Sequence, residues 1–192
     1  MWQGKVQNMV NERIKTKIKG ISPLLMHRFP LEPVQAIAKK SKEEQAEIAA
    51  YRDEETGELY IPGVAIQRAL IAAATYSKGK GRATLQKPVA ACVFVDPDQC
   101  ALGTKVYKID ARAVVVPATK GRIVRYRPRL DVWETAFSLD YDPELLTEQQ
   151  LRTVVDDAGA RVGLLDFRPE RKGPFGRYMV TAWERVRSTT PR

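Results

Sequence analysis

The chain has 192 residues, 44% of them hydrophobic, with a formal net charge of +9 and a pI near 9.6. Length and composition are ordinary for one globular domain, and the excess of Lys and Arg favours a polyanionic partner over an acidic one. No apolar run is long enough for a membrane helix or a signal-peptide core. We therefore expect a cytoplasmic protein without membrane contact.

Residues that bind metals or reactive cofactors are scarce. Cys92 and Cys100 lack the spacing of a zinc motif, and His27 is the only histidine. Walker and Rossmann patterns are missing, so neither a metal nor a cofactor is expected. The two cysteines fit a reducing compartment, with a hairpin disulfide as the alternative.

The N-terminal half predicts a strand, a loop and helices. Residues Glu12 to Gly20 alternate between basic and apolar side chains, as in a strand with one buried face. Three prolines break the stretch Ile21 to Pro33, so it should leave the sheet as an ordered loop. Val34 to Asp53 predicts one or two short helices. Pro62 suits the first turn of the clearest helix, whose apolar face comprises Ile66, Ala69, Leu70, Ala73 and Ala74.

The C-terminal half predicts strands and one further helix. Four runs have the composition of strands: Pro88 to Val95, Lys105 to Val116, Arg122 to Tyr126 and Val132 to Leu139. Thr147 and Gln150 stand at capping-box spacing and begin the helix, and Gly159 and Gly163 end it. Arg177 to Val186 is the expected last strand.

The order of these elements predicts an α+β fold. Strand, helix, two or more strands, helix and strand is the order of a ferredoxin-like or RNA-recognition-motif core, with helices on one face of an antiparallel sheet. We expect a single domain over residues 1–192, with hairpin or helical insertions near 23–60 and 77–104. The sheet face without helices would be open to a ligand.

A first basic segment, KGRIVRYRPR, contains no acid. In a strand, alternate arginines share one face, where their planar guanidinium groups suit a row of phosphates. The alternative is a solvent-exposed edge strand whose charges prevent aggregation. The candidate binding residues of this segment are Lys120, Arg122, Arg125, Arg127 and Arg129.

A second basic segment, FRPERKGPFGRY, precedes the last strand. Its glycines, Gly173 and Gly176, would let the backbone approach a ligand closely, and Phe175, like Tyr126 of the first segment, would stack on unpaired bases. The alternative is a surface turn with a hydrophobic anchor. Its candidate cations are Arg168, Arg171, Lys172 and Arg177.

Two motifs, in this order, resemble the RAMP superfamily of CRISPR-associated proteins. LYIPGVAIQRALIAAA looks like the family's strand-turn-helix segment, in which an Ile-Pro-Gly turn begins the first long helix, and GPFGRYMV resembles its glycine-rich loop. The closest likeness is to the subunits that coat guide RNA, and KGISPLLMHRF also looks like a phage-encoded protein type. The resemblance implies a thumb-like hairpin insertion and side-by-side assembly of copies along one strand. It also implies a backbone-binding role for Arg168, Arg171, Lys172, Gly173, Gly176 and Arg177.

These observations predict a non-enzymatic, sequence-tolerant binder of single-stranded nucleic acid. RNA is the expected ligand and DNA the alternative, in a filament of copies or a CRISPR-like ribonucleoprotein with other effector subunits. A second hypothesis is a RAMP-type endoribonuclease that processes guide RNA without a metal, with His27 as general acid or base. A third is a phage protein-interaction component whose basic surface is incidental.

Overall fold

A computed structural model of the protein describes residues 12–30, 33–79, 81–115 and 121–186. Four strands form its largest sheet, in the order β4, β8, β1, β9, and neighbouring strands are antiparallel. We call it the core sheet. Its strands are β1 (Glu12–Gly20), β4 (Phe94–Asp96), β8 (Glu134–Tyr141) and β9 (Tyr178–Val186).

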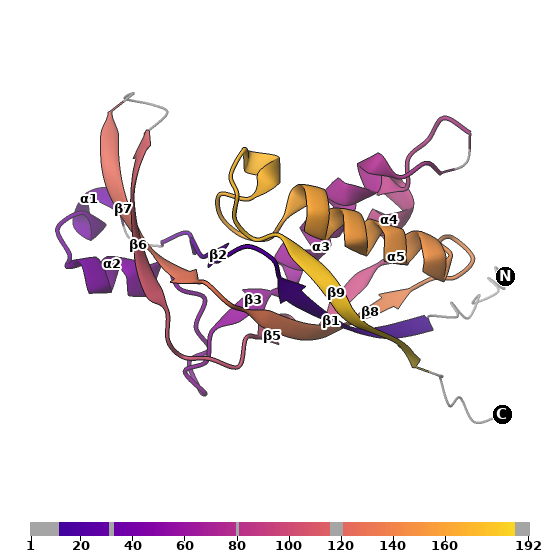
Figure 1. Cartoon of the computed structure of the whole chain (residues 1–192), viewed down its shortest axis with the longest axis horizontal. Coiled ribbons are helices and arrows are strands. Elements are labelled where there is room, and N and C mark those ends of the chain that lie inside the picture. The colour runs from indigo at the N-terminus through magenta and orange to yellow at the C-terminus, as the bar shows by residue number, and fades with distance from the viewer. Residues whose placement is uncertain (1–11, 31–32, 80, 116–120, 187–192) are drawn as a thin grey trace, which may run out of the picture.

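Helices α3 (Gly63–Ala73) and α5 (Glu148–Asp157) lie on one face of the core sheet (Figure 1). Along the chain the core elements follow the order β1, α3, β4, β8, α5, β9. This connectivity, with β1 between β8 and β9, is that of a ferredoxin-like α+β fold. The predicted fold class is therefore confirmed.

The central strand β1 follows the predicted alternation. Ile14, Thr16 and Ile18 are buried beneath the helices, whereas Lys15 and Lys19 are exposed on the opposite face. Because consecutive residues of a strand point to opposite faces, the pattern of the sequence appears directly as burial.

The start of α5 is as predicted, and the start of α3 differs by one residue. Pro62 is the residue before α3 rather than part of its first turn, and Thr147 forms a capping box with Gln150 at the start of α5. Gly159, however, does not end the helix. The helical segment continues through a π-helical turn (Ala158–Val162) and ends at Gly163. A Cβ atom at Gly159 would lie 2.3 Å from the carbonyl oxygen of Tyr178, so this glycine allows the turn to approach β9.

The predicted strand Pro88 to Val95 is wrong over most of its length. Its first part belongs to the helix α4 (Gln86–Cys92), and only β4 is a strand. Val89 and Cys92 are buried at helical spacing in the core. Pro88 is tolerated because the first amide groups of a helix have no carbonyl partner within it.

The strands β6 (Lys108–Val115) and β7 (Arg122–Leu130) lie outside the core sheet. They form a hairpin that projects from the core, and the short strand β2 (Leu24–Leu25) pairs with the base of β7 (Figure 1). In β6 only Asp110 is buried, and apolar side chains on the opposite face of the hairpin, such as Ile109, Val115 and Val124, are exposed. The hairpin is an insertion between β4 and β8. An insertion was expected over residues 77–104, but α4 and β4, which lie in that range, belong to the core.

Short elements lie beside the hairpin and the core. The expected helices after the proline-rich loop are α1 (Val34–Ile37) and α2 (Lys42–Ile48), and α2 packs against β7. The strands β3 (Tyr60–Pro62) and β5 (Gln99–Ala101) pair beside the core. Within the described ranges, no helix has the length and apolar content required to span a membrane.

Candidate nucleic-acid interface

The predicted arginine row exists on the projecting hairpin. Cross-strand pairing places Arg125 opposite Arg112 and Arg127 opposite Asp110. We call this side of the hairpin, which also includes Arg129, the arginine face. It therefore contains an acid and a further arginine from β6, neither of which is visible in the β7 sequence alone.

Acidic side chains neutralise the lower part of the arginine face. Asp110 accepts a hydrogen bond of 2.8 Å from Nε of Arg112, and its carboxylate also lies 3.9 Å from Arg129. Asp131, in the turn after β7, accepts hydrogen bonds from Arg129 and Lys108. Arg129 is therefore held by acids of the protein rather than presented to a ligand.

Arg127 is buried, and its guanidinium group forms an ion pair with Asp166. Only 7% of the Arg127 side chain is exposed, and Asp166 comes from the segment before β9. The pair therefore joins the hairpin to that segment. Arg127 is a structural residue here and not part of an exposed phosphate-binding row.

The segment before β9, residues 163–177, forms a compact loop that we call the basic loop. A Cβ atom at Gly173 would lie 1.8 Å from the carbonyl oxygen of Phe167, and one at Gly176 would lie 2.1 Å from that of Leu164. Both glycines therefore allow the loop to pack on its own backbone. The expected neighbour of both glycines was a ligand, but the atoms closest to them belong to the loop itself.

Phe175 anchors the basic loop on the arginine face. It is buried, and the guanidinium carbon of Arg112 lies 4.8 Å from its ring centroid, with that of Arg129 at 5.7 Å. Such cation–π contacts stabilise the docking of the loop. Phe175 is therefore not placed to stack on a base. It is instead the hydrophobic anchor of a surface turn, which was the alternative interpretation of this segment. Tyr126 is half-buried beside α2.

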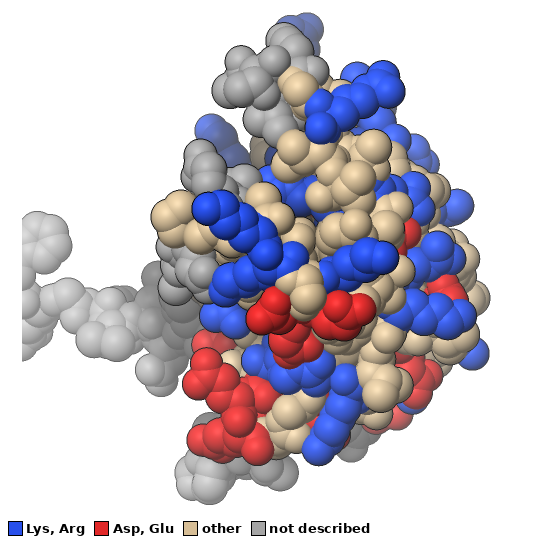
Figure 2. Space-filling view, turned by 90° about the vertical axis from the view of Figure 1, so that its left-hand side faces the viewer, with Lys and Arg blue, Asp and Glu red and all other residues tan. Residues whose placement is uncertain are grey.

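Five of the predicted cations remain open to a ligand, and we call them the open basic set. Their side chains make no hydrogen bond or ion pair with any residue that the structure describes, and all are exposed except the half-buried Arg125. Figure 2 looks onto the hairpin side, where Lys and Arg cover much of the surface and acids gather mainly in its lower part. The set comprises Arg122, Arg125, Arg171, Lys172 and Arg177.

Besides Arg127 and Arg129, two further predicted cations fall outside this set. Arg168 forms an ion pair with Glu170 and donates a hydrogen bond of 2.8 Å to the carbonyl oxygen of Leu165. Lys120 lies outside the described residues.

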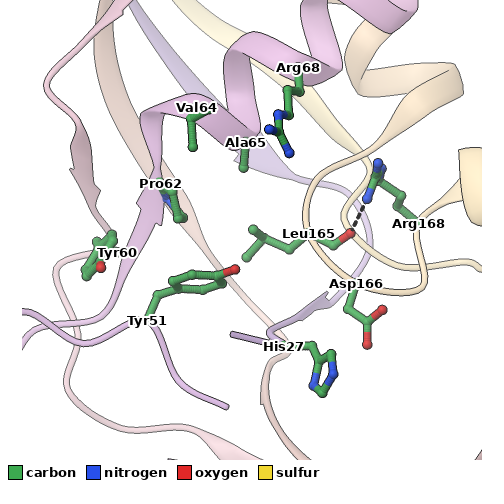
Figure 3. A pocket seen from close by; sticks show the side chains of 10 residues that line it. All are labelled: His27, Tyr51, Tyr60, Pro62, Val64, Ala65, Arg68, Leu165, Asp166 and Arg168. Atoms are coloured by element: carbon green, nitrogen blue, oxygen red, sulfur yellow. Dashed lines mark hydrogen bonds between the residues drawn. The ribbon is translucent and has the colours of Figure 1, made fainter. Parts of the chain in front are cut away.

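His27 lines a cavity of about 510 Å³ between α3 and the basic loop (Figure 3). Burial lowers the pKa of His27 below its ordinary value, and the positive charges of Arg125 and Arg127 act in the same direction, whereas Asp166 opposes them. The imidazole is therefore neutral at pH 7. Its Nδ1 atom is buried and has no hydrogen-bond partner among the described residues.

Arg68 and Tyr51 also line this cavity, and neither was among the predicted site residues. Arg68 is exposed on α3 and, among described residues, has no ion pair or hydrogen bond, and the Tyr51 ring is half-buried. The α3 segment was interpreted only through its apolar face. The sequence gives no signal for Tyr51, because the cavity is assembled from four separate segments.

The cysteines are not joined: Cys92 and Cys100 are buried free thiols, and burial raises the pKa of Cys100 to about 12. In the described ranges, no group of three His, Cys, Asp or Glu side chains is arranged to hold a metal ion. Comparisons with protein-family models and with curated proteins find no match.

Proposed function

We propose that the chain binds single-stranded nucleic acid, with RNA as the principal ligand, through backbone phosphates that contact the open basic set. The observation that carries this proposal is that cations from two segments have no ion pair with any described residue, although nearby acids neutralise Arg127, Arg129 and Arg168. Unpaired guanidinium and ammonium groups on a protein surface attract a polyanion over several ångströms.

The arrangement of the hairpin and the basic loop supports a single strand as the ligand. The loop docks on the arginine face through Phe175, so the open cations lie on two segments that contact each other. A flexible strand can bend to follow both segments. Phosphate contacts position a strand without reading its sequence, which makes the binding sequence-tolerant.

We further propose side-by-side assembly of copies along the strand, in the cytoplasm, as a filament or with other effector subunits. The support is the resemblance to the RAMP superfamily together with the projecting hairpin, which has the form of the implied thumb-like insertion. A phage-encoded relative of the guide-RNA-coating subunits would have the same properties.

The first test is light scattering of the protein with RNA and DNA oligonucleotides of increasing length. The mass of the complex should rise in steps of one 21.6 kDa chain as the strand lengthens, and RNA should bind more tightly than DNA. A monomer that ignores both strands at about 50 mM salt, where phosphate contacts are strong, contradicts the proposal and favours a protein partner.

A second candidate is cleavage of RNA at His27. The neutral imidazole lies in a cavity with Arg68 and Arg168, a setting in which it would take the proton of a ribose 2′-hydroxyl. The 2′-oxygen would then bond to the adjacent phosphorus as the bond from phosphorus to the 5′-oxygen breaks, and the leaving 5′-oxygen would take a proton from the protonated imidazole or from water.

The expected result for this candidate is loss of RNA cleavage in His27→Ala. The rate should be constant near pH 7 and fall only below the ordinary histidine range around pH 6.5, because burial lowers the pKa of His27 and its base form persists in mild acid. A DNA strand, which lacks the 2′-hydroxyl, is the negative control. Cleavage that survives in His27→Ala rules out this role.

A further inference from the structure

The cavity beside His27 has walls of two chemical kinds. Its volume of about 510 Å³ falls within the ~300–1,000 Å³ of typical small-molecule sites. Its walls come from α3, β3, the basic loop, the segment after β2 and the segment after α2, which carries Tyr51 (Figure 3). One end is cationic, and the other is aromatic and apolar.

The cationic end lies at the start of α3. No side chain caps this helix, and its first turn contains no acid, so the partial positive charge of its N-terminus is not offset locally. Arg68 projects from the second turn of α3 toward Leu165 and Arg168 (Figure 3). A phosphate between Arg68 and the first turn of α3 would meet positive charge from a side chain and from a helix end.

The aromatic end is formed by Tyr51 and Tyr60. The Tyr51 ring extends across the cavity between Tyr60 and Leu165 (Figure 3), and its centroid lies 5.9 Å from that of Tyr60. Pro62 and Val64 add apolar surface on the same side. A flat group would find one aromatic face and apolar walls here.

Asp166 and His27 set the orientation of a ligand. The Asp166 carboxylate lines the cavity and repels a phosphate, so the phosphate belongs at the Arg68 end. Its oxygens accept hydrogen bonds from Arg127 and from the amide of Phe167, and each oxygen has a further lone pair. A ligand must therefore bring N–H donors to this end, as the edge of a nucleobase does.

We infer that this cavity takes one nucleotide, with its phosphate at Arg68 and the start of α3 and its base on Tyr51, facing Asp166 and His27. The inference rests on the proposed function in one respect, because the nucleotide would be turned out of the bound strand. A free nucleoside monophosphate offers the same chemistry, and the experiment separates the two sources.

The experiment measures binding of 5′-AMP, adenosine and ribose 5-phosphate by NMR titration. The intact nucleotide should bind at least about tenfold more tightly than either half. Arg68→Gln and Tyr51→Leu should each weaken the binding of 5′-AMP by about tenfold, and Tyr51→Phe should bind it with the wild-type affinity. Val64 is 56% exposed on α3, so Val64→Trp blocks the cavity without removing a core side chain.

The outcomes distinguish this inference from the proposed function. The three cavity variants, Arg68→Gln, Tyr51→Leu and Val64→Trp, are also tested with a single-stranded oligonucleotide. Weaker binding of both the oligonucleotide and 5′-AMP assigns the cavity to a nucleotide of the strand, whereas weaker binding of 5′-AMP alone assigns it to a free nucleotide.

Three results overturn the inference. They are the absence of 5′-AMP binding, a response to Arg68→Gln without one to Tyr51→Leu, and equal affinity for 5′-AMP and ribose 5-phosphate. If any of these results is obtained and the oligonucleotide still binds the wild-type protein, the proposed function is not contradicted. If the wild-type protein binds 5′-AMP but no oligonucleotide, only the proposed function fails.

Discussion

Replacing Arg171, Lys172 and Arg177 with glutamine is expected to weaken binding of single-stranded RNA on the order of 100-fold at moderate salt. These three cations of the basic loop are exposed and make no ion pair with a described residue. Each phosphate contact to a single strand contributes about 0.7 to the slope of log K against log salt concentration, so losing three should make the slope shallower by about 2. Fluorescence anisotropy over a series of salt concentrations measures both quantities.

The matched control removes three charges from another part of the surface. Lys78, Arg82 and Lys87 are likewise exposed, and among described residues their side chains have no ion pair or hydrogen bond. Replacing them with glutamine lowers the net charge by the same amount but should leave the salt slope unchanged. Equal losses in both triple variants would show that net charge, rather than the basic loop, determines binding.

Arg127→Ala is expected to lower the free energy of unfolding by about 1.5–3 kcal/mol. The Asp166 carboxylate, which is 30% exposed and keeps its hydrogen bond from the Phe167 amide, loses its ion-pair partner at the junction of the hairpin and the basic loop. Arg125→Ala, two residues earlier on the same face, should change that free energy by no more than about 0.5 kcal/mol. Chemical denaturation of the two variants measures the difference.

The same pair of variants separates stability from binding. Arg125→Ala should weaken RNA binding although the protein remains stable, since Arg125 has no ion-pair partner among described residues. Similar stability of the two variants would contradict the structural role assigned to Arg127. Any charge-removal experiment on this surface should therefore leave Arg127 unchanged.

The sequence predicted those elements whose patterns depend on local physics. The alternation of β1 and the capping box of Thr147 are set within a few residues, and both are confirmed. Both strands of the hairpin were predicted as strands, but their alternating residues resemble those of a core strand, so the sequence does not show that they leave the core sheet. α4 was mistaken for a strand because its short apolar run fits either structure.

The candidate interface was predictable only in part. The shared face of Arg125 and Arg127 follows from strand geometry, but Asp110 and Asp166 come from other segments, and their positions decide which arginine stays open. The glycine-rich sequence around Gly173 likewise predicts a close backbone contact, but not that the contact is with the carbonyl oxygen of Phe167. Such neutralisation and close packing arise from the tertiary structure.

The docking of the basic loop on the hairpin has a consequence for protein synthesis. Arg127 leaves the ribosome 39 residues before its partner Asp166, and Phe175 follows later still. The contacts that join the arginine face to the basic loop, namely the Arg127–Asp166 ion pair and the packing of Phe175, therefore form only after the basic loop has emerged. A nascent chain, or one truncated before the basic loop, therefore lacks this joined surface, and the proposed function predicts that it does not bind a strand.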